Sequence, residues 1–143
     1  MEWYASVVNL KFNQVVFHTL FYTYYYLGQS EDPFRRQSYH REHAKVFSDY
    51  EEFEDRPSVL LYDKAWSKTY LEHCRKKAFD VVLSEALESL KAQACFARRT
   101  FSRAELHLNN IRHIQHHASQ LRLRLKTHSQ QHIPWFGSDW TDA

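Results

Sequence analysis

The sequence predicts an all-α fold in a single domain, and three observations lead to this expectation. The chain has 143 residues, which is enough for one hydrophobic core but short for two. It contains only 2 Gly and 3 Pro, whereas a β-sandwich or barrel needs many tight turns. Hydrophobic residues make up 43% of the chain and recur at helical spacing over long stretches. Residues 1–143 are therefore expected to form one domain of long helices joined by few connections.

The first helix is expected over residues 3–27. Its apolar and aromatic stripe, interrupted by Gln14, consists of Trp3, Val7, Leu10, Phe17, Phe21 and Tyr24. Gly28 is expected to end this helix, since glycine adopts the left-handed conformation at no steric cost. The uncharged part, residues 12–27, is shorter than the roughly 20 apolar residues that a bilayer requires and includes polar side chains. No membrane span is therefore expected.

Residues 29–62 are expected to be a long connection with some helix. Asp32-Pro33 and Arg56-Pro57 should interrupt regular structure, because a proline disfavours the helical conformation of the residue before it. A short helix is expected between these two breaks, within residues 39–54. The acidic side chains of this segment should lie at the solvated surface.

Two further long helices are expected in the second half of the chain. One begins after Asp63, a suitable N-cap, and continues to about Gln93, because no Pro or Gly interrupts it. The other begins at Ser102, whose spacing to Glu105 fits a capping box, and is bounded by Pro134. Its apolar stripe, which should face partner helices, consists of Ala104, Leu108, Ile111, Ile114, Ala118, Leu121 and Leu125.

The ten histidines are the most unusual feature of the composition. His113 and His117 stand four residues apart in the last helix, so they lie about 40° apart around its axis and one turn from each other. Such a pair can bind one divalent ion, and the alternative is two ordinary polar positions. His116 points away from this face and is expected at the surface.

Two other closely spaced pairs of histidines are interpreted as chance. His128 and His132 fall at the frayed end of the last helix, before the proline that bounds it. His40 and His43 lie in the connection, where no long helix is expected to hold them in a fixed geometry. Neither pair is expected to bind a metal.

His18 is the candidate for a third ligand. It lies in the most apolar segment of the chain, next to Phe17 and Leu20, and a buried imidazole requires a partner. That partner is either a hydrogen-bonding group, such as a carbonyl or a nearby tyrosine, or a metal ion shared with His113 and His117. Three histidines with an open fourth position are typical of a catalytic metal site.

Three segments of the chain carry a family resemblance. They are FHTLF and YYYL at residues 17–21 and 24–27, YLEHCR at 70–75, and NIRHIQHHASQL at 110–121. In this order they resemble the DinB/YfiT-like superfamily of metalloenzymes. The resemblance implies an up-down-down-up four-helix bundle in which His18, His113 and His117 bind a divalent metal and Gln120 supports them from outside.

The resemblance also implies an activity. Characterised relatives include metal-dependent transferases that add a low-molecular-weight thiol such as bacillithiol to electrophiles, and a mycothiol-dependent isomerase. A thiol S-transferase is therefore expected, in which the metal lowers the pKa of the thiol and positions it for attack. No nucleophile or general base of the protein itself is assigned, so the catalytic residues are unknown.

The sequence departs from the family at two places. Members have a helix before the one that carries His18, and this helix is missing or shortened here, because Met1 precedes the expected first helix by only a few residues. Residues 39–54 could fill the gap, a homodimer could complete the bundle, or the gene start could be misplaced. Relatives also often carry an acidic residue where this chain has Tyr24, so no supporting carboxylate is expected there.

Two functions remain open from the sequence: an enzyme acting on a small thiol and an electrophile, and a non-enzymatic metal-binding bundle that acts in assembly or partner binding. Nucleic acid is not an expected partner, because the net charge is only +2 and the basic residues are spread around the last helix. The absence of a secretory signal and of a CxxC pair, with Cys74 and Cys95 far apart, predicts a cytoplasmic protein. Three imidazoles and a water suit Zn, Ni, Cu or Fe(II) equally.

Overall fold

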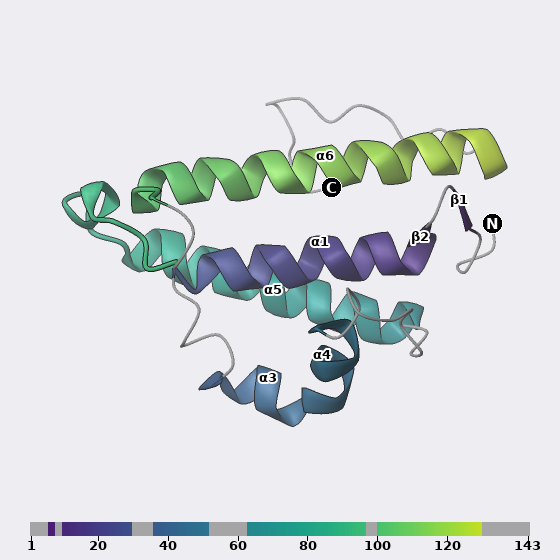
Figure 1. Cartoon of the computed structure of the whole chain (residues 1–143), viewed down its shortest axis with the longest axis horizontal. Coiled ribbons are helices and arrows are strands. Elements are labelled where there is room, and N and C mark those ends of the chain that lie inside the picture. Colours follow the sequence, from purple (N-terminus) through teal and green to yellow (C-terminus); the bar gives the residue numbers. More distant parts are fainter. Residues whose placement is uncertain (1–5, 8–9, 30–35, 52–62, 97–99, 130–143) are drawn as a thin grey trace.

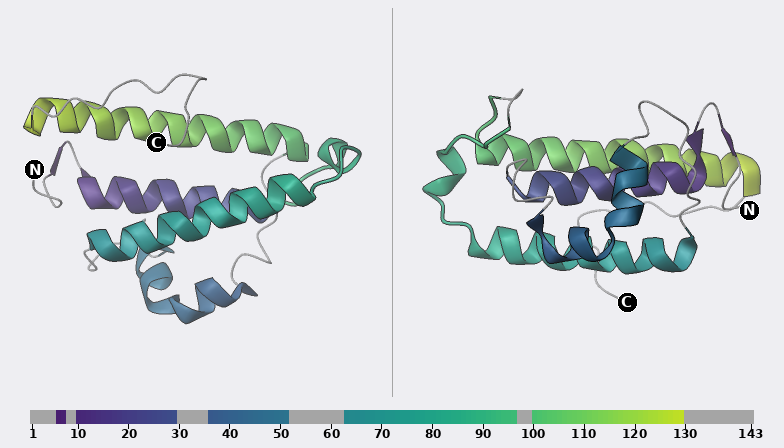
Figure 2. Two further views of the ribbon diagram at one scale, coloured as in Figure 1. Left: turned by 180° about the vertical axis from the view of Figure 1, so that it is seen from behind. Right: turned by 60° about the horizontal axis from the view of Figure 1, so that its bottom comes forward.

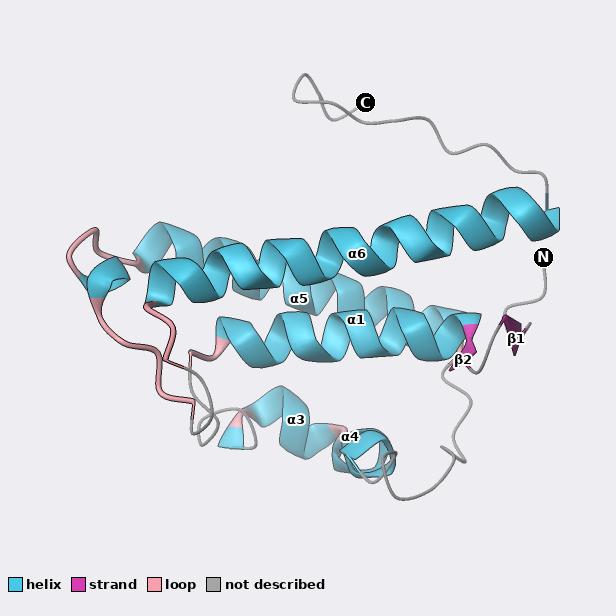
Figure 3. Ribbon diagram, turned by 45° about the horizontal axis from the view of Figure 1, so that its top comes forward, coloured by secondary structure: helices cyan, strands magenta, loops and turns pink. Residues whose placement is uncertain are grey.

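The computed structural model describes residues 6–7, 10–29, 36–51, 63–96 and 100–129, and these residues are almost entirely helical (Figure 1, Figure 3). The all-α expectation is therefore confirmed. The long helices are α1 (Phe12–Leu27), α5 (Lys64–Ser84) and α6 (Arg103–Ser129). The short elements are α3 (Ser38–Glu42), α4 (Ala44–Glu51), the 3₁₀ turn η1 (Ser89–Lys91), and the two-residue antiparallel strands β1 (Ser6–Val7) and β2 (Leu10–Lys11).

The helix α1 lies between the other two long helices and contacts both (Figure 1). α5 runs parallel to α1 and α6 runs antiparallel to it, while α3 and α4 pack on the side away from α6 (Figure 2). These directions match three members of an up-down-down-up bundle. Within the described ranges there are three long helices, so a fourth bundle helix remains an expectation.

The expected start of the first helix at residue 3 is wrong, because α1 begins at Phe12. Before it, Ser6 pairs with Lys11 and Val7 with Leu10 across the two short strands. The Lys11 backbone is extended, and its N–H donates to the side-chain Oε1 of Gln14 at 2.9 Å. This bond satisfies a donor at the end of the helix, so a glutamine three residues into α1 marks its first turn. Trp3 lies outside the described residues.

The first helix ends at Gly28 as predicted, but the left-handed conformation expected of Gly28 is adopted by another residue. Gly28 itself is right-handed (φ −72°), and the next residue, Gln29, takes the left-handed conformation (φ 61°). The N–H of Gln29 donates to the carbonyl of Tyr26 at 3.1 Å, and its own carbonyl accepts from the N–H of Cys95 at 2.9 Å. These bonds hold the strained backbone of Gln29 in place and tie the end of α1 to the segment before α6.

The expected second long helix begins as predicted but ends early. The Asp63 side chain accepts from the N–H of Trp66 at 2.7 Å, which confirms the N-cap. The helix ends at Ser84 and not near Gln93, although no Pro or Gly intervenes. The next residue, Glu85, is extended, and its carboxylate, only 4% exposed, pairs with Arg103 and His107 of α6. The helix therefore ends next to a residue that forms ion pairs with another helix. Local sequence patterns do not predict such a long-range contact.

The hydrophobic core is mainly aromatic. Its larger cluster joins α1, α4 and α5 around residues that are almost fully buried: Phe17, Leu20, Phe21, Tyr24, Phe47, Tyr70 and Cys74. A smaller cluster at the other end joins α1 and α6 through Tyr26, Ala94, Phe96 and Leu106. Because α1 contributes to both clusters, apolar residues surround it on nearly all sides, as expected for a central helix.

The helix α6 begins as the sequence predicts. The N–H of Ser102 donates to Glu105 Oε2 at 2.8 Å, and the N–H of Glu105 donates to Ser102 Oγ at 3.2 Å. This is the reciprocal pair of bonds of a capping box.

The middle of the apolar stripe predicted for this helix is exposed, although Ala104, Leu121 and Leu125 of the same stripe are half-buried. Leu108, Ile111 and Ile114 are 62%, 51% and 37% exposed. The face that packs on α1 is instead the mixed stripe of Leu106, Asn110, His113 and His117.

Candidate metal centre

Three histidines from two helices converge at the contact between α1 and α6. His18 comes from α1, and His113 and His117 come from α6; one ring nitrogen of each lies within 4.8 Å of the other two. The Nε2 atoms of His18 and His113 are 3.4 Å apart. The His117 ring lies 4.7 Å from the His18 ring and 4.6 Å from the His113 ring, between centroids. The three residues singled out in the sequence are thus brought together, although His18 and His113 are 95 positions apart in the chain.

The register of α6 against α1 places these rings. Leu106 is fully buried in the contact, and the Asn110 side-chain amide donates to the carbonyl of Thr23 at 3.2 Å. Asn110, His113 and His117 follow one another at spacings of three and four, so anchoring Asn110 turns both imidazoles toward α1. The nearest site residue on α1, His18, stands five positions before Thr23 and faces them.

A hydrogen bond outside the cluster orients His117. Its Nδ1 lies 2.8 Å from Gln120 Oε1, so Nδ1 carries the proton and Nε2 keeps its lone pair. The amide nitrogen of the same Gln120 lies 3.1 Å from His116 Nε2, which fixes the amide orientation. This is the arrangement that supports a metal-binding imidazole from its far side, in the position that the resemblance implied for Gln120.

The electrostatic setting keeps the cluster neutral. Burial, together with the charge that His117 would carry, lowers the pKa of His18 to about 4. Burial and the three neighbouring imidazoles lower the pKa of His113 to about 4. Burial also lowers the pKa of His117, although its bond to Gln120 opposes the shift. Neutral imidazoles are the form that binds metals, so the ligands are ready at neutral pH.

The observed spacing fits a small divalent ion. Zinc binds imidazole nitrogen at about 2.0–2.1 Å, and tetrahedral geometry then places two ligand nitrogens about 3.3–3.4 Å apart. The His18–His113 separation of 3.4 Å already has this value. The third ligand atom lies within 4.8 Å of the other two. Three imidazoles leave a fourth position for an exogenous ligand.

Two tyrosines of α1 form the rest of the wall, and sequence reasoning did not identify them. Tyr22 stands one turn after His18, with its ring 4.8 Å from that of His18 and 5.5 Å from that of His113. Tyr26, one turn further, is 6.2 Å from the His113 ring. The spacing of four from His18 to Tyr22 to Tyr26 was the available signal, but it was hidden in a run of aromatic residues.

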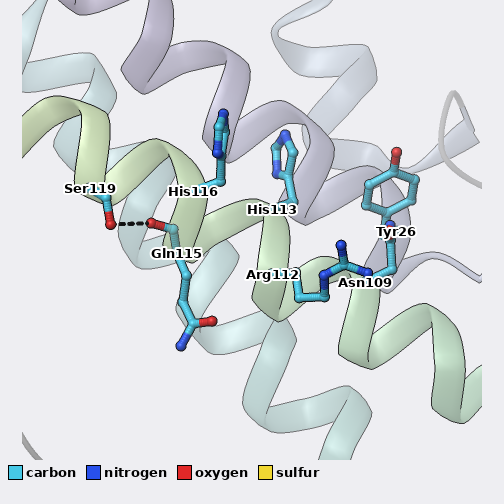
Figure 4. A pocket seen from close by; sticks show the side chains of 7 residues that line it. All are labelled: Tyr26, Asn109, Arg112, His113, Gln115, His116 and Ser119. Carbon is cyan, nitrogen blue, oxygen red and sulfur yellow. Dashed lines mark hydrogen bonds between the residues drawn. The ribbon is translucent and has the colours of Figure 1, made fainter.

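Beside the cluster, a pocket of about 640 Å³ opens along α6 (Figure 4). It shares one residue, His113, with the three-histidine cluster. Its lining residues are Tyr26, Asn109, Arg112, His113, Gln115, His116 and Ser119. The cluster therefore has a neighbouring space in which a substrate could lie.

The remaining histidine predictions have different outcomes. Among the residues that the structure describes, no group of potential ligands besides His18, His113 and His117 comes together. His116 is exposed, as expected. His40 is buried and stacks on Phe47 with 4.3 Å between ring centroids, so it has a packing role that the sequence did not suggest. His128 is exposed, and His132 lies outside the described residues.

Tyr24, at the position where the resemblance led us to look for a supporting acidic residue, does not reach the cluster. It is 1% exposed and packs against α5, with its ring 5.9 Å from that of Tyr70 and 4.0 Å from the Lys77 ammonium. This position therefore faces the opposite side of α1 from α6. It has no part in supporting the three histidines.

Comparison with known proteins identifies no relative: no family model matches the chain, and no curated protein or solved structure matches it significantly. No helix in the described ranges is long and apolar enough to span a bilayer. What the structure shows is a helical fold with three clustered histidines that could hold a metal ion.

Proposed function

We propose that the chain is a divalent-metal-dependent enzyme of the DinB/YfiT-like type and that it transfers a small thiol to an electrophile. The observation that carries this proposal is the convergence of His18, His113 and His117 from two helices on one point. Their lowered pKa values and the hydrogen bond that His117 Nδ1 donates to Gln120 Oε1 support it. The class of reaction comes from the family resemblance of residues 17–27, 70–75 and 110–121.

The chain supplies binding and orientation. His18, His113 and His117 would hold a divalent ion, and a site with three protein ligands would leave room for a substrate ligand. A divalent ion in this position supplies Lewis acidity, which favours the thiolate form of a bound thiol. Tyr22 closes one wall with its ring, which limits the access of water to the reacting sulfur. The nucleophile is the substrate thiol, so no nucleophilic residue of the protein is required.

The first test is metal content. Tag-free protein and the variant His18→Ala are loaded with Zn, Ni or Fe(II), dialysed and analysed by mass spectrometry. We expect close to one ion per chain in the wild type and a large loss in the variant. Equal metal content in both would show that His18 is not a ligand and would overturn the three-histidine site.

The second test is chemical. The metal-loaded protein is incubated with a low-molecular-weight thiol and a chromogenic electrophile, and formation of the thioether is followed. We expect a rate above that of the metal-stripped protein, and recovery of this rate on adding back the ion. Stoichiometric metal without any thiol binding would instead favour a non-enzymatic role.

A second candidate function is favoured by one observation. Large apolar side chains are exposed on α5 and α6, including Phe79 (62%), Leu83 (82%) and Leu108 (62%). Where such side chains form a contiguous patch, they mark a surface that binds another protein. In this alternative the metal is structural and the helices assemble with another copy as a homodimer or with a partner. Light scattering across a concentration series distinguishes a monomer from a dimer.

A further inference from the structure

The pocket beside the three histidines has an uneven charge. Of the described residues, seven line it, and Arg112 is the one among them with a fixed charge. In Figure 4 the rings of His113 and His116 stand on one side of α6, and the Arg112 side chain extends along the helix toward Asn109 and Tyr26. Arg112 therefore belongs to the pocket and not to the three-histidine cluster, and it stands one position before His113 in the chain.

The surroundings of Arg112 do not neutralise it. After Glu105, the rest of α6 contains no Asp or Glu over residues 106–129. Two other arginines have acidic partners: Arg75 pairs with Glu72, and Arg103 pairs with Glu85. Arg112 makes no ion pair with any residue in the described part of the chain.

A divalent ion held by His18, His113 and His117 would add to this positive field. Two positive centres, the ion and the guanidinium, would then flank one pocket whose described lining residues include no Asp or Glu. Such a field attracts and orients anionic ligands. The guanidinium fork matches a carboxylate in particular, because two parallel N–H donors meet its two oxygens.

We propose that Arg112 is a specificity-determining residue that binds a carboxylate of the substrate, so that the enzyme prefers thiols carrying a carboxylate a few bonds from the sulfur. The proposal rests on the proposed function, because it assigns the pocket to a substrate whose sulfur lies at the open position of the metal site. His113 links the two points of attachment: its ring is a ligand of the ion, and the residue before it is the arginine. A substrate bound at both points has a fixed orientation along α6.

The test measures binding and not turnover. Cobalt(II) replaces the natural ion, and its absorption spectrum reports a thiol entering the coordination shell. Two probes of equal spacer length are titrated, 3-mercaptopropionate and 3-mercaptopropanol. The ratio of their dissociation constants is compared between wild type, Arg112→Gln and the control Lys126→Gln. Lys126 is exposed in the last turn of α6, outside the pocket, so its loss removes the same charge elsewhere.

We expect Arg112→Gln to weaken binding of the mercaptocarboxylate about tenfold and to leave binding of the mercaptoalcohol within about twofold, with cobalt content unchanged. Lys126→Gln should change neither constant by more than about twofold. A carboxylate preference that persists in Arg112→Gln, or an equal loss for both thiols, would overturn the assignment while leaving the proposed function intact. Failure of the wild type to bind cobalt would overturn the proposed function and this assignment together.

Discussion

Two adjacent histidines of α6 provide the sharpest test of the site. His117 contributes a ligand atom to the cluster, whereas His116 contributes none and lies outside it, with its ring 4.9 Å from that of His117 and its Nε2 beside the side-chain amide of Gln120. Both are imidazoles at consecutive positions of the same helix. The variants His117→Ala and His116→Ala therefore differ mainly in whether a ligand is lost.

The expected magnitudes follow from these positions. Losing a partner that supports a ligand from outside weakens metal binding by about 10- to 100-fold, so losing the ligand itself should cost more than about 100-fold. His116 is not a ligand and contacts Gln120 through an exposed hydrogen bond worth about 1 kcal/mol. Its loss should therefore weaken metal binding roughly fivefold. At a metal concentration about 100 times the wild-type Kd, the metal should raise the free energy of unfolding by about 2.7 kcal/mol in wild type, 1.8 in His116→Ala and at most 0.4 in His117→Ala.

The assay is urea denaturation of metal-stripped, tag-free protein with and without a fixed zinc concentration, supported by calorimetric titration of zinc. The difference between the two unfolding free energies isolates the contribution of the metal from any change in the intrinsic stability of the variant. Equal metal-dependent stabilisation in His116→Ala and His117→Ala would refute the ligand assignment. A larger loss in His116→Ala would indicate that the two imidazoles exchange roles.

Three further predictions follow from the same structure. Burial lowers the pKa of two site histidines to about 4 and also lowers the pKa of the third. Zinc affinity should therefore fall less than about tenfold between pH 7.5 and 5.5, whereas protonation of three ordinary imidazoles would reduce it roughly 1,000-fold. Titration calorimetry of zinc across this pH range distinguishes the two cases. Burial alone would raise the pKa of Glu85, but its bonds from the side chains of α6 hold this pKa below the ordinary value. Its contribution to stability is thus complete above the pKa of the unfolded chain and is lost as pH falls through the folded pKa. Glu85→Gln should lower the free energy of unfolding by about 1–3 kcal/mol at pH 7 and far less at pH 3, while Glu88→Gln, at an exposed position, should have little effect at either pH. In the core, Phe17→Ala should cost about 3–5 kcal/mol because Phe17 is fully buried, and Leu83→Ala, 82% exposed, should stay within about 0.5 kcal/mol in the same denaturation experiment.

Much of the helical framework was predictable because its signals are local. The N-cap at Asp63 and the capping box of Ser102 and Glu105 were predicted from residue type and spacing alone, and both bonds are present. The two helix boundaries that were predicted wrongly are the end of α5 and the start of α1. The first depends on a long-range contact and the second on an unusual capping residue. α5 ends where Glu85 pairs with residues of α6, and α1 begins where the side chain of Gln14 accepts from the backbone of Lys11, which is not a usual capping residue.

The three site histidines were also predictable, but the face of α6 that carries them was not. The prediction followed apolar periodicity and chose the stripe of Leu108, Ile111 and Ile114, which is exposed. The stripe that packs on α1 is interrupted by Asn110, His113 and His117, so a search for apolar spacing passes over it. Periodicity fails here for a physical reason, because a helix that builds a polar site must place polar groups toward its partner.

That polar face has a consequence for stability. The Nδ1 atom of His113 is buried without a hydrogen-bond partner among the described residues, and such an atom costs about 1–3 kcal/mol relative to an apolar group of similar shape. Leucine at the positions of His113 and His117 would continue the apolar contact that Leu106 begins. The metal-free variant with both histidines replaced by leucine should therefore be more stable than metal-free wild type, as measured by urea denaturation. A less stable variant would mean that the imidazoles hold the two helices together by their own contacts, and the case for a site built to receive a ligand would weaken accordingly.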